Sequence, residues 1–185
     1  MSNYNVSTRY AKALLDLSTD TGMFEKVSED VEVIYKALSE SRELRTMLLN
    51  PVIREEKKVS VLSEIFKSHI SDDTMKFMKF VVNKSRGNII KDILRRFIEL
   101  KNDRLGIIEV GVVSNSEMTD VQKNNLEMKM KERTGKSVIL SYNTDESLIG
   151  GFRLKLKDTI IDASVKHQLE ELRKSFLGEK MISTN

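Results

Sequence analysis

The sequence of 185 residues contains no cysteine and only two histidines, and both scarcities limit its chemistry. Without thiols the chain cannot form disulfides, thiolate zinc sites, iron–sulfur centres or a cysteine nucleophile. His69 and His167 lie 98 positions apart, so neither is paired with a second histidine at the spacing of a metal-binding helix face. We therefore expect no metal and no cofactor.

Long apolar segments are absent as well. No run approaches the roughly 18–20 residues that a membrane span requires. Charged residues recur through the first 20 positions, at Arg9, Lys12, Asp16 and Asp20. They interrupt any apolar leader, and the acidic ones argue against a transit peptide. These patterns predict a soluble intracellular chain that does not insert directly into a membrane.

Neither sign of charge dominates the sequence. Lys and Arg number 31 against 28 Asp and Glu, for a formal net charge of +3. A nucleic-acid-binding protein normally concentrates positive charge on one face or arm, whereas acids and bases alternate almost everywhere here. That alternation is typical of a solvated helical surface. A single proline and eight glycines are few for this length, which also favours helix.

Apolar residues recur at helical spacing through the first 105 residues. The first helical face comprises Val6, Tyr10, Ala13, Leu14 and Leu17. Five more helices are predicted to begin near Phe24, Ser41, Arg54, Ser71 and Asn88, with interruptions at Gly22, Pro51 and Gly87. Several are too short to be stable alone, so they must pack against one another. Residues 1–105 are therefore predicted to form a six-helix bundle.

The pattern changes in residues 106–185, which predict a small α+β domain. β-branched residues over 107–113 and alternating apolar residues over 137–142 and 152–157 indicate strands. Thr119 and Gln122 have the spacing of a capping box, and Gly135 is a suitable helix stop. A last helix is predicted to begin near 162–164 and to bury Val165, Leu169, Leu172 and Phe176. The whole chain is thus expected to be mainly α.

No candidate catalytic site emerges from these elements. Gly150-Gly151 lacks the remainder of a phosphate-binding loop and predicts instead a tight backbone approach leading into a strand. Thr134-Gly135-Lys136 is better interpreted as a helix end than as part of a P-loop. An enzyme needs a positioned nucleophile, base or metal, so the residues themselves indicate a two-part interaction protein without catalysis.

Two sets of motifs carry the interpretation further. Residues 9–14 read RYAKAL, and residues 148–152 read LIGGF, followed by IDAS at 161–164 and LEEL at 169–172. In this order and spacing they resemble the δ subunit of the rotary ATP synthase, called the oligomycin-sensitivity-conferring protein in mitochondria. Lys157 departs from the family, whose hairpin usually has a small turn-forming residue there, and leaves the geometry of the Lys157-Asp158 turn open.

The resemblance implies a non-catalytic stator subunit in the peripheral stalk. In this family the N-terminal bundle, here 1–105, caps the catalytic head and holds the N-terminal helix of an α subunit. The smaller C-terminal domain, here 106–185, meets the b subunits of the stalk. The complex couples proton or sodium flow to ATP synthesis. The chain is then expected to be a monomer within a hetero-oligomer, on the cytoplasmic side of a bacterial cell membrane, or at the thylakoid if it is plastid-encoded.

The family's groove for the α-subunit helix lies between the first and fifth helices. The corresponding residues here are Tyr10, Ala13, Leu14, Met78 and Val81. All five could instead belong to the core of the bundle, although the small Ala13 suits a groove floor.

A helical adaptor that binds nucleic acid is the alternative interpretation. It would use Lys155, Lys157 and the Arg95-Arg96 pair. Neutralising phosphates would make its affinity steeply salt-dependent, unlike that of an apolar groove for a helix.

Overall fold

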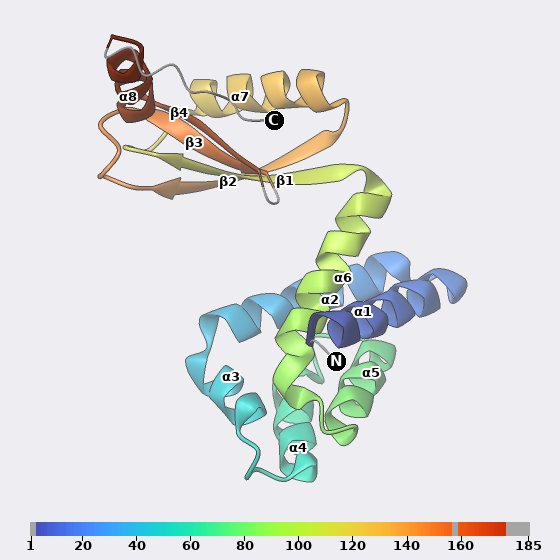
Figure 1. Cartoon of the computed structure of the whole chain (residues 1–185). Helices are drawn as coiled ribbons and strands as arrows, with labels where there is room; N and C mark the ends of the chain where they lie inside the picture. The colour runs from blue at the N-terminus through green and yellow to red at the C-terminus, as the bar shows by residue number, and fades with distance from the viewer. Residues whose placement is uncertain (1–2, 157–158, 177–185) are drawn as a thin grey trace. The chain divides into compact units, whose positions relative to one another are not determined.

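The computed structural model describes residues 3–156 and 159–176 (Figure 1). The chain divides into two compact units between Arg104 and Leu105. Across the described ranges, no helix is both long enough and apolar enough to cross a membrane. The predicted mainly α architecture with a small sheet is confirmed.

The first unit is entirely helical in its described part. Its elements are α1 (Asn3–Asp20), α2 (Phe24–Glu40), α3 (Arg42–Leu49), α4 (Glu55–Phe66), α5 (Asp72–Asn83), the short 3-10 helix η1 (Gly87–Ile89) and α6 (Ile90–Leu105). One hydrophobic core joins them, and α6 contributes Ile90, Ile93, Leu94 and Phe97, all almost fully buried. Each helix is short or amphipathic, so this shared core is what stabilises the set.

Local chemistry sets the helix boundaries. Ser41 and Ser71 are the N-caps of α3 and α5, and their hydroxyls accept hydrogen bonds from the N–H groups of Leu44 and Thr74. The predicted end of the fifth helix at Gly87 is wrong. The helix ends at Asn83, and the chain then turns through Ser85, whose φ of 56° lies in the left-handed region. Gly87 instead begins η1.

The second unit contains a four-stranded sheet. Its elements are β1 (Ile107–Ser114), α7 (Asp120–Thr134), β2 (Ser137–Thr144), β3 (Gly151–Leu156), β4 (Thr159–Ser164) and α8 (Val165–Phe176). The strand order is β2-β1-β3-β4, with β1 parallel to β2 and the other pairs antiparallel. The parallel pair is joined through α7, which lies along one face of the sheet in Figure 1. The core between them contains Val110, Val112, Leu126, Met130 and Leu154.

Sequence features placed the ends of α7 and the start of β3 correctly. Thr119 and Gln122 form the expected capping box, and Gly135 has the left-handed φ of 65° typical of a helix stop. At Gly151, where φ is 78°, an added Cβ would lie 2.4 Å from the carbonyl oxygen of Ala163. The tight backbone approach predicted at Gly150-Gly151 is therefore confirmed. The Lys157-Asp158 turn lies outside the described residues.

The prediction that the last helix buries its apolar face is wrong. No residue of α8 is buried, and the apolar side chains Val165, Leu169, Leu172 and Phe176 are all exposed, Phe176 by 84%. The helix attaches to the sheet through its first turn, where the N–H of Val165 donates to the carbonyl of Gly150 and that of His167 to the hydroxyl of Ser164. Beyond this first turn Leu169, Leu172 and Phe176 are each more than half exposed in the described part of the chain.

Candidate partner-binding groove

A deep groove of about 690 Å³ opens on the surface of the first unit. α1 forms one wall and α5 the other, and residues around the start of α2 complete it. The apolar lining residues are Val6, Tyr10, Ala13, Leu14, Leu17, Met23, Val27, Phe77 and Phe80. Its charged residues are Arg9, Asp73, Lys76 and Arg86. An apolar trough with a few charges between two helices has the properties of a site for an amphipathic helix.

α1 contributes to both the core and the groove because apolar residues cover more than one stripe of its surface. Ala11, Leu14 and Leu15 are buried in the core, whereas Leu17 is 53% exposed within the groove. Ala13 is exposed and also lines the groove. Tyr10 is half-buried, with its ring packed against the core. The three α1 residues named from the sequence, Tyr10, Ala13 and Leu14, therefore lie together on the groove wall.

The two α5 residues named from the sequence lie elsewhere. Met78 and Val81 are 1% and 0% exposed, in the core rather than along the groove. Phe77 and Phe80 line the groove in their place, since one residue along an α-helix rotates the side chain by about 100°. The sequence did carry a signal for them, because two aromatic residues three positions apart share one side of α5.

Aromatic rings and cations cluster at one end of the groove. The ring centroids of Tyr10 and Phe80 are 6.3 Å apart. The guanidinium of Arg86 lies 5.9 Å from the centre of the Tyr10 ring, and the Lys84 ammonium lies 5.7 Å from that of Phe80. Both distances are within the range of cation–π attraction. These contacts preorganise the rings that face the groove.

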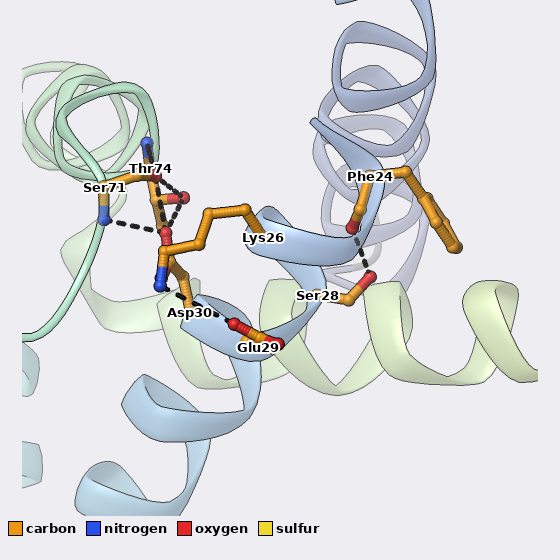
Figure 2. Close-up of polar contacts among 7 residues, drawn as sticks. All are labelled: Phe24, Lys26, Ser28, Glu29, Asp30, Ser71 and Thr74. Atoms are coloured by element: carbon orange, nitrogen blue, oxygen red, sulfur yellow. Dashed lines mark hydrogen bonds and ion pairs between the residues drawn. The ribbon is translucent and has the colours of Figure 1, made fainter. Parts of the chain in front are cut away.

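Asp30 on α2 fixes the beginning of the α5 wall. Its Oδ2 accepts hydrogen bonds from the backbone N–H of Ser71 at 2.8 Å and from Thr74 Oγ1 at 2.8 Å, and Lys26 Nζ lies 3.3 Å from its Oδ1 (Figure 2). Burial, to 1% exposure, would by itself raise the pKa of this carboxyl. The hydrogen bonds from Ser71 and Thr74, together with Lys26, outweigh burial and hold its pKa below the ordinary value.

The basic residues named for nucleic-acid binding are divided between the two units, and the arginines are paired with acids. Arg95 pairs with Asp92 at 3.5 Å, and Arg96 pairs with Glu99 at 2.6 Å. Lys155 is exposed on β3 in the other unit, and Lys157 lies outside the described residues. In residues 3–156 and 159–176 there is also no group of three or more His, Asp or Glu residues that could hold a metal ion. The groove is the candidate site.

The sequence matches the model of the ATP synthase delta (OSCP) subunit family over residues 6–176. The chain belongs to this family. The resemblance inferred from the RYAKAL and LIGGF motifs is confirmed, and so is the expected function as a peripheral-stalk subunit of the ATP synthase. Nothing supports the nucleic-acid-binding alternative.

Two bacterial relatives match this delta-family chain along nearly its entire length. "ATP synthase subunit delta" of Chlorobium phaeobacteroides (strain BS1) is 37% identical, with 97% of this chain and 99% of that protein covered. The protein of the same description from Chlorobaculum tepidum is 38% identical, with 97% and 99% covered. In the Toxoplasma gondii mitochondrial ATP synthase hexamer, one chain is 19% identical, with a TM-score of 0.73 and coverage of 92% and 97%. That likeness shows a shared fold.

Proposed function

We propose that this delta-family subunit works without catalysis, by holding the N-terminal helix of an α subunit in the groove between α1 and α5. The observation that carries the proposal is the groove itself, an open apolar trough of about 690 Å³ between two packed helices. A six-helix bundle of residues 1–105 provides the rigid walls. Leu17 and Phe80 offer apolar surface to an incoming helix, while Ala13 permits close approach of its backbone.

The C-terminal domain, 106–185, is proposed to meet the b subunits of the stalk through α8. Its side chains Val165, Leu169, Leu172 and Phe176 form an exposed apolar face on an amphipathic helix that has charged residues elsewhere. A contiguous apolar face of this kind is costly in water and is typical of a protein–protein interface. One such contact in each domain would let a single chain tie the catalytic head to the stalk.

In this arrangement the subunit is a monomer within a hetero-oligomeric complex and catalyses no reaction itself. It resists rotation of the head, so that proton or sodium flow is coupled to ATP synthesis. We place it on the cytoplasmic side of the bacterial cell membrane, or at the thylakoid in a plastid-encoded case, held there by its partner subunits.

Calorimetric titration tests the groove. The full chain is titrated with a synthetic peptide that spans the N-terminal helix of the α subunit from the same genome, and we expect one site. Leu17→Ser and Phe80→Ser should weaken binding, whereas Leu49→Ser should not, because Leu49 is equally exposed but lies outside the groove. Unchanged affinity in the Leu17→Ser, Phe80→Ser double variant would place the α-subunit helix elsewhere.

The role of α8 is tested separately. Leu169→Ser combined with Leu172→Ser should abolish binding of the soluble part of the b subunits and leave the α-subunit peptide affinity unchanged. Glu170→Ser and Glu171→Ser, on the same helix, serve as the control. Retention of b binding by the leucine variant would exclude α8 as the stalk contact.

A further inference from the structure

Of the four charged residues that line the groove, two form an ion pair with each other and two do not. Asp73 and Lys76 neutralise each other in an ion pair of 2.8 Å on α5. The other two charged lining residues are Arg9 and Arg86. Neither guanidinium forms an ion pair with an acidic side chain of residues 3–156 or 159–176. The groove therefore presents two uncompensated positive charges to an occupant.

Both charges lie at the same end of the groove. Arg9 precedes Tyr10 on α1, and the Arg86 guanidinium lies 5.9 Å from the centre of the Tyr10 ring. Tyr10 in turn contacts Phe80 near the C-terminal end of α5. The opposite end is lined by Asp73, at the beginning of α5, and by Thr21, at the end of α1. Because Asp73 is already paired, the positive potential is confined to the Tyr10 end.

The contact with the Tyr10 ring leaves the hydrogen-bonding capacity of Arg86 available. A cation–π attraction does not occupy the N–H donors of a guanidinium, which lie in its plane. Those donors match the two oxygens of a carboxylate. The ring also restricts the side chain, so less conformational entropy is lost when an anion binds.

We propose that the helix bound in the groove carries an acidic side chain that pairs with Arg9 and Arg86 while its apolar face packs against Ala13, Leu17 and Phe80. This inference rests on the proposed function and adds the chemical character of the partner. The apolar contacts supply most of the affinity, and the carboxylate fixes the register of the helix in the groove. A register shift by one turn would move the acid away from both guanidinium groups, by about 5.4 Å.

Both arginines are exposed, so their individual effects are modest. Exposed ion pairs change an equilibrium by at most a few-fold each. We expect Arg9→Gln and Arg86→Gln each to weaken peptide binding about threefold at low ionic strength, and the double variant about tenfold. Charges at the rim of an interface act chiefly on the association rate and are screened by salt. The loss of affinity in the arginine variants relative to the wild type should therefore come mainly from a slower association rate. This loss should become smaller in about 0.5 M salt.

The experiment uses the full chain and the α-subunit N-terminal peptide described above. Affinity and association rate are measured for the Arg9→Gln, Arg86→Gln and double variants, at low and high salt. Arg86→Lys retains the positive charge but not the paired N–H donors, so it should bind more tightly than Arg86→Gln and more weakly than the wild type. Lys12→Gln removes the same charge from α1, but Lys12 does not line the groove, so it is the matched control. Circular dichroism verifies that every variant remains folded.

Amide replacement of the acidic residues in the peptide completes the test. If one carboxylate pairs with the arginines, its replacement should weaken binding to the wild type but cost nothing further in the double arginine variant. Equal losses in both chains, or an arginine effect no larger than that of Lys12→Gln, would overturn the acidic anchor and leave the groove assignment intact. Failure of the unmodified peptide to bind the wild type would instead overturn the proposed function and this inference together.

Discussion

Oδ2 of Asp30 accepts two hydrogen bonds from a single residue 41 positions further along the chain, Ser71, whose backbone N–H and hydroxyl approach to 2.8 and 2.5 Å. Ser71 is also the N-cap of α5. A buried carboxylate on α2 thus holds the first turn of the helix that forms one wall of the groove. A negative charge at a helix N-terminus also interacts favourably with the helix macrodipole.

We predict that Asp30→Ala destabilises the first unit by about 3 kcal/mol, because the Ser71 N–H and the Thr74 hydroxyl would lose a charged acceptor. For a cooperative unit of about 100 residues, that corresponds to a fall in melting temperature of roughly 12 °C or more. Glu29→Ala on the same helix is the control, because the Glu29 side chain is exposed to solvent. Equal melting temperatures for the two variants would show that the Asp30 contacts contribute little.

Asp30 also predicts a dependence of stability on pH. Its pKa is lower in the folded protein than its ordinary value of about 3.9. The stabilisation is therefore fully present above about pH 4 and is lost as the pH falls through the folded-state pKa. The difference in unfolding free energy between wild type and Asp30→Asn should be larger at pH 5 than at pH 3 in urea titrations. A difference that does not change with pH would contradict this assignment.

The Asp30 contact shows why some features could be predicted from the sequence and others could not. Caps such as Ser41 and Thr119 depend on residues three positions away, so the local pattern was sufficient. Asp30 looks like one more charge on a solvated helix, since its partners lie 41 and 44 positions away. No periodicity within α2 identifies such a distant contact.

The lining of the groove and the exposure of α8 were also difficult to predict, because both depend on how a helix packs against distant parts of the chain. Apolar residues occupy more than one side of α5, so helical spacing alone could not decide whether Met78 or Phe77 faces the core. In α8 the amphipathic pattern correctly predicted a helix, but such a pattern does not say what covers the apolar face. The exposure of Leu172 and Phe176 became apparent only from the structure.

Gly151 gives a prediction for the second unit. In Gly151→Ala the new Cβ would meet the backbone of Ala163 and Ser164, and φ would remain at an unfavourable 78°. We expect a loss of about 3 kcal/mol or more, with the far-UV signal of the helices in the first unit retained. Gly135→Ala is the matched control, because its φ of 65° is also positive but no atom lies within 4 Å of the added Cβ. It should cost only about 1 kcal/mol. Comparable losses at both positions would show that the close approach at Gly151 is relieved by small shifts.

The division between Arg104 and Leu105 predicts that a chain truncated after Arg104 folds by itself. The buried residues of the first core all lie between Val6 and Phe97, and the Arg104 guanidinium donates to the hydroxyl of Thr19 within the same unit. Thermal melting followed by circular dichroism should show one cooperative, strongly helical transition. An aggregated or non-cooperative product would show that the second unit is needed for folding.

Ala11 and Ala13 provide a paired test of the groove on a single helix. Ala11 is fully buried in the core, whereas Ala13 is exposed and lines the groove. Aspartate at position 13 would leave the free protein hydrated and folded. In the complex, however, its carboxylate would be desolvated against the apolar face of the partner helix, at a cost of several kcal/mol. We therefore expect Ala13→Asp to melt close to the wild type and to bind the α-subunit peptide about a hundredfold more weakly.

Ala11→Asp should behave in the opposite way, because a carboxylate in the core has no partner and the free protein itself is destabilised. The two variants add the same charge to the same helix. Any difference between them in stability or in peptide affinity therefore reflects whether the side chain faces the core or the groove. Thermal melting and peptide titration are measured on both. If Ala13→Asp unfolds, or if it retains wild-type affinity while folded, then Ala13 is not a contact of the bound helix.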